Sequence, residues 1–204
     1  MTPDGDGSGS VTGTLAPDRI RAVMQQHAAG FNNCFRRSSG SYVSGAARLR
    51  FVVGASGRVE HVWVAQSDLG SWAIEDCMVQ TARFLEFPAP PGGRARFDFP
   101  FRWNEAGSRL AQRLDEGWGY PALRKERSAI ERCRQLHGFD APFRITAYVG
   151  RKGRPLSVGM HAERRPSERF VACAVHAVEA VSFPDPGHRV VKYVALVEDL
   201  RDAP

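Results

Sequence analysis

A fixed spacing of 96 positions recurs along this 204-residue chain and constrains its fold more than any single motif. Five pairs of residues keep this spacing (150 − 54 for the first): Gly54 and Gly150, Gly57 and Gly153, Cys77 and Cys173, Phe87 and Phe183, and Pro88 and Pro184. Cys34 and Cys133 lie 99 positions apart (133 − 34), which places a three-residue length difference in the loop after the first helix. One register across so many landmarks is typical of an internal repeat, so we predict two copies of one module.

The repeat and the composition together predict the domain boundaries. Residues 1–13 are rich in Gly, Ser and Asp and are expected to form a flexible linker. The first module is expected over 14–104, a connection over 105–120 and a degenerate second module over 121–200.

Within the first copy, hydrophobic periodicity predicts the order helix, strand, strand, helix, strand. Apolar residues recur at helical spacing from Pro17 to Phe35, and Pro17 suits the first helical turn. The remaining predicted elements are strands over 47–53 and 58–66 around a Gly-containing turn, a helix over 71–87 and a last strand over 94–103. Pro88 ends the second helix, because the residue before a proline avoids the helical region.

The second copy repeats this order in weaker form. It is expected to contain helices over 123–136 and 165–181 and strands over 143–150, 155–163 and 188–197. The predicted fold class is therefore α+β, with two tandem α-β-β-α-β modules. In each module, two helices are expected to cover one face of a three-stranded antiparallel sheet.

The last strand of the first copy alternates aromatic and charged residues. Phe97, Phe99, Phe101 and Trp103 are expected on one face, and Arg94, Arg96, Asp98 and Arg102 on the other. A short sheet of this kind leaves backbone groups unpaired at its edge, and such edges recognise extended peptides. The edge arginines could either select an acidic partner segment or only prevent aggregation.

Each predicted helix carries one cysteine. If both helices of a module cover the same face of the sheet, Cys34 can meet Cys77 and Cys133 can meet Cys173. Four cysteines allow three pairings, and the repeat favours the pairing within each copy. Disulfides would indicate an oxidising compartment. Two alternatives stay open: four buried thiols, or a zinc site formed by Cys133, His137, Cys173 and His176.

The chain lacks the motifs of most catalytic and cofactor sites. No dinucleotide-binding, P-loop, nucleophile-elbow, zinc-protease or EF-hand pattern occurs, so we expect no enzymatic activity, cofactor or small-molecule substrate. The formal net charge of +6 comes from scattered residues without a basic block, so nucleic-acid binding is not predicted. Glu75 and Asp76 are expected on the solvent side of their helix.

Three stretches of the first copy carry a resemblance to a known family: IRAVMQQHAAGFNNCFRR, RLRFVVGASGRVEHVWVAQSDLGSWAIEDCMVQ and FPAPPGGRARFDFPFRW. They resemble the C-terminal module of myxobacterial gliding-motility proteins of the AgmX/PglI type, which is similar to the C-terminal domain of TonB. The resemblance covers about residues 14 to 104. The second copy keeps Cys133, Gly153, Cys173 and FPDP, but lacks the double glycine and the Pro-Phe of the last strand.

The resemblance implies a non-enzymatic, periplasmic module of a longer protein that an upstream segment anchors in the inner membrane. Domains of this type link a proton-driven inner-membrane motor to outer-membrane proteins, and they pair their last strand with short TonB-box-like peptides. The expected partner-binding residues are Arg94, Arg96, Phe97, Asp98, Phe99 and Arg102, within 93–103, with a second edge at 188–197. A passive structural spacer or a cell-wall-binding module is the alternative, and a zinc-binding or enzymatic domain is a further one.

Overall fold

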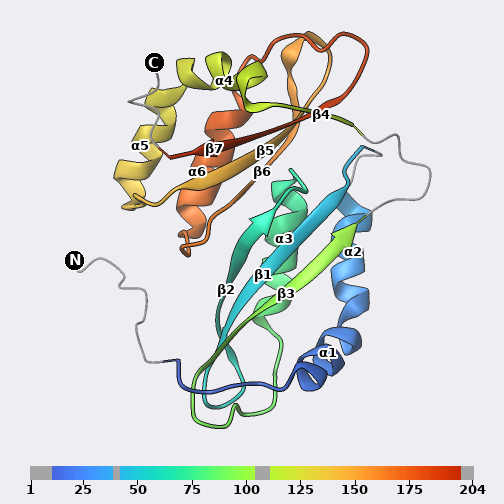
Figure 1. Cartoon of the computed structure of the whole chain (residues 1–204), viewed down its shortest axis with the longest axis vertical. Coiled ribbons are helices and arrows are strands. Elements are labelled where there is room, and N and C mark those ends of the chain that lie inside the picture. Colours follow the sequence, from blue (N-terminus) through green and yellow to red (C-terminus); the bar gives the residue numbers. More distant parts are fainter. Residues whose placement is uncertain (1–10, 39–41, 104–110, 199–204) are drawn as a thin grey trace.

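The computed structural model describes residues 11–38, 42–103 and 111–198 and shows a mixed α+β protein. Within these residues, six α-helices accompany two sheets, one with strand order β2-β1-β3 and one with strand order β4-β7-β5-β6 (Figure 1). The first sheet is three-stranded and antiparallel, as predicted. The second has four strands where three were predicted, because a short strand joins it from the expected connection.

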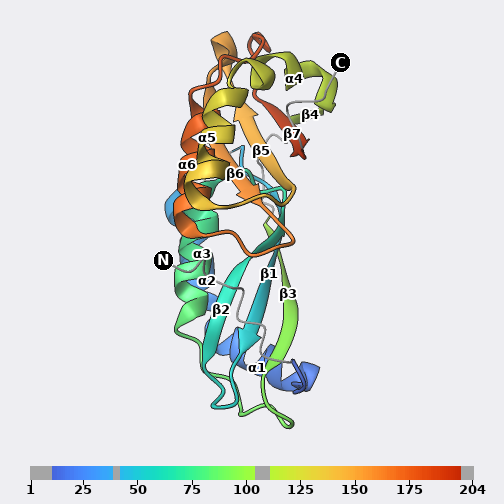
Figure 2. The same cartoon turned by 90° about the vertical axis from the view of Figure 1, so that its left-hand side faces the viewer.

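The first half follows the predicted order with one difference. Its elements are α1 (Pro17–Gln26), α2 (Ala28–Ser38), β1 (Gly45–Val53), β2 (Val59–Ser67), α3 (Trp72–Arg83) and β3 (Ala95–Trp103). The single helix expected from Pro17 to Phe35 breaks at His27, which leaves the helical conformation at φ −102° and ψ 7°. α2 and α3 cover one face of the sheet, and α1 lies at the end of the sheet where β3 begins (Figure 2).

The second half adds two elements ahead of the expected start. Its elements are β4 (Gln112–Leu114), α4 (Glu116–Lys125), α5 (Arg127–His137), β5 (Phe143–Val149), a 3₁₀ turn (Arg151–Gly153), β6 (Pro155–His161), α6 (Glu168–Glu179) and β7 (Val191–Val197). β4 and the first half of α4 lie within 105–120, which was expected to be a connection without regular structure. The helix expected over 123–136 breaks at Glu126, with φ −93° and ψ 9°.

The helices of the two halves coincide at the spacings found in the sequence. Shifting α1 and α2 by 99 positions gives the bounds of α4 and α5 (116 − 17 and 127 − 28), and shifting α3 by 96 gives those of α6 (168 − 72). The breaks at His27 and Glu126 also lie 99 positions apart (126 − 27). The helix break is thus a shared feature of both halves rather than a local irregularity of one.

The recurring glycines occupy one type of turn. Gly57 has φ +86° and Gly153 has φ +69°, a region that glycine enters at low cost. The carbonyl of Gly57 accepts a hydrogen bond from the amide of Phe87 (2.9 Å), and that of Gly153 accepts one from Phe183 (3.0 Å). A Cβ at either glycine would overlap the carbonyl oxygen of that phenylalanine. This close approach explains why each glycine recurs together with a Phe-Pro dipeptide.

Two disulfides join the helices within each half, which confirms the predicted pairing. Cys34 on α2 is bonded to Cys77 on α3, and Cys133 on α5 is bonded to Cys173 on α6. The Cα atoms lie 5.6 and 5.7 Å apart, inside the usual range for disulfides. Each bond therefore fixes two helices over the same face of their sheet.

The two halves are packed against each other through side chains of the second sheet. Tyr148 on β5 is fully buried and belongs to the apolar core of the first half. Its hydroxyl accepts from the amide of Ser44 (3.0 Å) and donates to the carbonyl of the same residue (2.9 Å). Lys192 on β7 also donates to that carbonyl and pairs with Asp68 at 3.1 Å. These contacts set the orientation of the halves.

Glu75 on α3 lies in the same interface, although it was expected on the solvent side of its helix. It is 1% exposed and accepts hydrogen bonds from the Ser67 hydroxyl (2.6 Å) and from the Met160 amide of the second half (3.1 Å). Burial raises its pKa to about 8, against the lowering effect of these two hydrogen bonds. The expectation for Glu75 was therefore wrong, because contacts with the second half bury this position of α3.

Candidate functional site

The candidate site is the outer edge of β3, defined as the backbone groups of residues 96–103 that point away from β1. β3 lies at the end of its sheet, and its full length pairs with β1 on the inner side. The opposite end of the sheet, β2, lies beside the second half, where the Ala162 amide donates to the Val64 carbonyl (3.3 Å). Among the described residues, the outer edge of β3 is therefore where the first sheet can accept another strand.

Two residues show which backbone groups point outward. Pro100 has no N–H and occupies the middle of β3, so its backbone must face away from β1. At the start of the strand, the Arg94 carbonyl accepts a hydrogen bond from the Gly13 amide (2.9 Å), and Gly13 lies on the outer side of β3. Because backbone direction alternates along a strand, the groups of Arg96, Asp98, Pro100 and Arg102 point outward.

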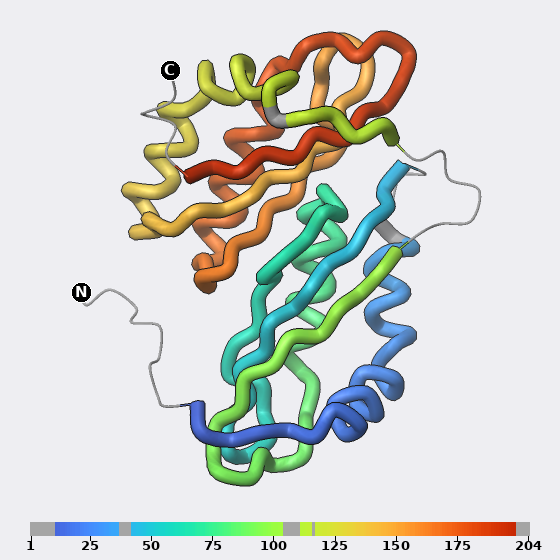
Figure 3. The backbone as a smooth tube through the Cα atoms, in the orientation of Figure 1, coloured from blue at the N-terminus to red at the C-terminus, as the bar shows by residue number. Residues whose placement is uncertain are grey.

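The chain itself closes the first part of this edge. Gly13 forms an isolated parallel bridge with Ala95, and residues 11–16 then run past the start of β3 to α1 (Figure 3). Thr14 turns back to donate to the Pro91 carbonyl (3.2 Å). The free edge therefore begins at about Arg96 and extends to Trp103, the last described residue of the strand.

The two faces of β3 have the predicted composition. On the helix face, Phe101 packs on Phe31 of α2 with ring centroids 4.8 Å apart, and Phe97 packs on Phe51 at 5.0 Å. Phe97 and Phe99 are both half-buried, so part of each ring stays accessible beside the edge. On the opposite face, Arg96 and Arg102 are exposed.

Two of the predicted partner-binding residues bind within the chain instead. Arg94 forms an ion pair with Glu60 (2.5 Å). Asp98 accepts two hydrogen bonds from Arg50 of β1 (2.7 and 2.9 Å) and lies 3.5 Å from Arg48. The hydrogen bond with Arg50 lowers the pKa of Asp98 and raises that of Arg50. Asp98 thus organises the sheet face rather than offering a free carboxylate.

The open face of the first sheet also contains residues that the sequence did not single out. Arg50 binds Glu163 of the second half at 2.8 Å, and the Trp63 indole donates to the Glu163 carbonyl (3.3 Å). The Arg50 guanidinium lies over the Trp63 ring at 5.8 Å. Only the packing of the two halves brings Glu163 to this face, so periodicity within one copy could not reveal it.

The last strand of the second half differs from the expected second open edge at 188–197. β4 pairs in parallel with its first three residues, Val191 to Tyr193. At the other end, Arg134 of α5 donates to the carbonyls of Val197 and Glu198 (3.0 Å each). All residues of β7 except Leu196 are buried. The chain thus closes the start and the end of this edge and buries the strand.

The zinc alternative loses its ligands in this structure. The sulfur atoms of Cys133 and Cys173 are bonded to each other, which leaves no thiolate to join His137 and His176. Across residues 11–38, 42–103 and 111–198, no group of three or more His, Cys, Asp or Glu side chains is placed to hold a metal ion.

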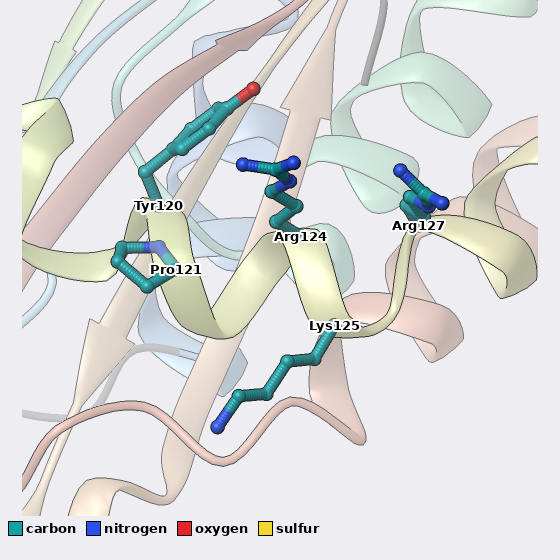
Figure 4. A pocket seen from close by; sticks show the side chains of 5 residues that line it. All are labelled: Tyr120, Pro121, Arg124, Lys125 and Arg127. Atoms are coloured by element: carbon teal, nitrogen blue, oxygen red, sulfur yellow. The ribbon is translucent and has the colours of Figure 1, made fainter. Parts of the chain in front are cut away.

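A shallow depression of about 450 Å³ lies at the bend between α4 and α5 (Figure 4), whereas β3 lies in the other half of the molecule (Figure 1). Tyr120, Pro121, Arg124, Lys125 and Arg127 line it. The side chains of Tyr120, Arg124 and Arg127 point to one side of the helix and that of Lys125 points to the other (Figure 4). The cations therefore do not converge on one point, and the depression lacks the enclosed apolar walls of a typical small-molecule site.

No protein-family model matches the chain, and a search of curated proteins finds no significant match. None of the helices in the described part of the chain combines the length and apolar character that a membrane span requires.

Proposed function

We propose that the chain is a non-enzymatic interaction module of a trans-envelope machine of the gliding-motility or TonB type, and that it binds partner segments by strand addition at β3. The observation that carries this proposal is the outer edge of β3, which offers outward amides at Asp98 and Arg102 and outward carbonyls at Arg96, Asp98, Pro100 and Arg102. An extended peptide that pairs with these groups gains main-chain hydrogen bonds without any rearrangement of the sheet.

Two tandem copies of a TonB-like module form the scaffold in this proposal. Support comes from the coincident helix bounds, the matched glycine turns and the matched disulfides. A further match is the segment that closes each last strand, since Gly13 bridges Ala95 in parallel and Gln112 pairs with Val191 in parallel. These pairs differ by 99 and 96 positions (112 − 13 and 191 − 95), the spacings of the repeat.

The proposed compartment is the periplasm, with the chain held there by an inner-membrane anchor in a longer protein. Two disulfides without a free cysteine among the described residues suit an oxidising environment. The proposed partners are segments of outer-membrane or periplasmic proteins that resemble TonB boxes.

An NMR titration of the full 204-residue chain tests the proposal. The probes are blocked seven-residue peptides from periplasmic segments of outer-membrane proteins. Shift changes are expected to centre on Asp98 and Arg102 and to spare β7. Arg102→Pro is the matched control, because it removes one outward N–H without breaking a bond to β1. Shifts that cluster away from β3, or that persist unchanged in Arg102→Pro, would contradict strand addition there.

A structural spacer is the second candidate, and the fixed packing of the two halves favours it. Tyr148, Lys192 and Glu75 hold the halves in one orientation, which suits a rigid extension between two envelope layers. Co-sedimentation of the chain with purified peptidoglycan separates this function from the first. Binding that survives Arg102→Pro would favour a wall-binding spacer over an edge-binding module.

A further inference from the structure

The charges beside the free edge of β3 limit which extended segment can bind there. Arg96 and Arg102 are exposed on the open face of the sheet, and they point to the same side because they lie an even number of positions apart (102 − 96 = 6). Between them lie Pro100, which carries no charge, and Asp98, which together with Glu163 balances the charges of Arg48 and Arg50. The edge thus presents positive charge at both ends and little net charge in the middle.

The faces of an added strand follow from this register. Residues directly opposite each other on neighbouring strands place their side chains on the same face. A segment that pairs with β3 therefore places alternate side chains beside Arg102, Pro100, Asp98 and Arg96. The side chains between them lie on the helix face beside Phe101, Phe99 and Phe97, whose half-buried rings offer apolar contact.

We infer that the partner is an extended segment with two acidic residues six positions apart, small uncharged polar residues between them on the same face, and apolar residues on the opposite face. One acid would lie beside Arg102. The other would lie beside Arg96, at the last position of the added strand, because Gly13 occupies the edge beyond it. This inference rests on the proposed strand addition and specifies its partner.

Pro100 limits the number of hydrogen bonds that any such segment can form. Its carbonyl can accept from the partner, but no N–H is available to the partner's carbonyl at that position. Because the middle of the ladder is weakened in this way, side-chain contacts at the two ends contribute a larger share of the discrimination between peptides. The positions of the acidic residues in a peptide should therefore have a measurable effect on its affinity.

Two blocked peptides of identical composition test the inference on the full chain. The first, Glu-Val-Thr-Val-Thr-Val-Glu, has its acids six positions apart and is palindromic, so it offers the same pattern in either strand direction. The second, Val-Glu-Thr-Val-Thr-Glu-Val, moves both acids to the apolar face. Titration followed by the amide shifts of Asp98 and Arg102 gives both affinities in low salt.

The first peptide is expected to bind about three- to tenfold more tightly than the second, which is the range for two partly exposed ion pairs. The preference is expected to fall below about twofold in 1 M salt, where the screening length is about 3 Å. It is also expected to disappear in the Arg96→Gln/Arg102→Gln variant. Arg132→Gln, an exposed substitution on α5, is the matched control and is expected to keep it.

The outcomes separate this inference from the proposed function. If both peptides shift Asp98 and Arg102 with equal affinity, strand addition stands and the charge pattern is wrong. If the second peptide binds more tightly, the pattern is likewise overturned. If neither peptide shifts β3 at any concentration while the chain stays folded, the proposed strand addition fails and this inference fails with it.

Discussion

β3 and β7 occupy equivalent places in the two halves, yet their surroundings differ. Each is the last strand of its half, pairs with the first long strand and meets a parallel segment at its start. Beside β3 the parallel segment makes a single bridge, from Gly13 to Ala95. Beside β7 the parallel segment is β4, which pairs with three residues. β3 is half exposed along its length and β7 is almost wholly buried.

The difference shows how similar arrangements of strands can supply an accessible edge in one half and a support in the other. β4 is held against β7 because Asp115 caps α4 by accepting from the Trp118 amide (3.1 Å), and Trp118 stacks on Phe183 at 6.1 Å. The other face of β7 meets the first half through Lys192. The second half thus uses its last strand to hold the first half, and the first half keeps its own last strand accessible.

Removal of either disulfide should cause the largest loss of unfolding free energy, and the loss should be similar in the two halves. Cys34→Ala/Cys77→Ala opens a crosslink over 43 residues, and Cys133→Ala/Cys173→Ala opens one over 40. Each double variant is expected to lose about 4 kcal/mol of unfolding free energy, because the unfolded chain regains the entropy of a loop of this length. Urea unfolding measures it. A loss confined to one pair would contradict an equivalent scaffold in the two halves.

Alanine at the shared turn glycine should have the next largest effect. Gly57→Ala and Gly153→Ala each place a Cβ against a backbone carbonyl at positive φ, so each is expected to cost about 3 kcal/mol. Gly138→Ala is the control, because Gly138 also has positive φ but has nothing within 4 Å of its Cβ position. Thermal unfolding of the three variants measures these losses. If only one of the two turn variants lost more stability than Gly138→Ala, the turns of the two halves would not be equivalent.

The buried carboxyl at the interface should make stability depend on pH. On folding, the pKa of Glu75 rises from 4.5 to about 8, so its contribution is complete below pH 4.5 and is lost as the pH rises through about 8. His161 acts in the opposite sense, since burial lowers its pKa from 6.5 to about 4 and its contribution is lost as the pH falls through that range. Between pH 6.5 and 8, Glu75 therefore contributes more than His161 to the pH dependence of stability.

Stability in that window is expected to fall by up to about 1.4 kcal/mol per pH unit in the wild-type chain and to be flat in Glu75→Gln. The side-chain amide introduced by Glu75→Gln can accept a hydrogen bond from the Met160 backbone amide and donate one to the Ser67 hydroxyl, so the contact between the halves is retained. Asp76→Asn, one residue along α3, is the control that keeps the slope. Urea unfolding at several pH values measures the slope, and an equal slope in Glu75→Gln would exclude Glu75 as its source.

The smallest effect on stability is expected for proline at the free edge. Arg102→Pro removes an outward N–H that pairs with no strand of the described chain, so it should cost less than about 1 kcal/mol. Ala195→Pro in β7 removes an N–H from an internal strand and should cost about 3 kcal/mol or more. Equal costs for the two substitutions, measured by thermal unfolding, would show that the N–H of Arg102 is paired as well and that the outer edge of β3 is not free.

Much of this fold was readable from the sequence, because spacing and periodicity are local signals. The glycine, cysteine and Phe-Pro landmarks predicted the paired disulfides and the order of the elements over 17–103. The start of the second half was misplaced because α4 contains Gly117, Gly119 and Pro121. Proline and glycine disfavour a helix interior, so periodicity appeared to begin only at Leu123.

Only those features of the site that depend on β3 alone could be predicted from the sequence. Alternation along 94–103 gave the two faces of β3 correctly, whereas the partners of Arg94 and Asp98 lie on other strands. Glu75, Tyr148 and Glu163 take their roles from the packing of the two halves, which no local pattern encodes. The closure of β7 also depends on that longer-range arrangement.

Amide hydrogen exchange along β3 in the free, full-length chain tests the central claim most directly. If the outer edge is unpaired, the outward amides of Asp98 and Arg102 exchange rapidly, and the inward amides of Phe97, Phe99 and Phe101 are protected by β1. Protection of Asp98 and Arg102 equal to that of their neighbours would show that another segment or a second chain already pairs with this edge. Strand addition by a partner would then be contradicted.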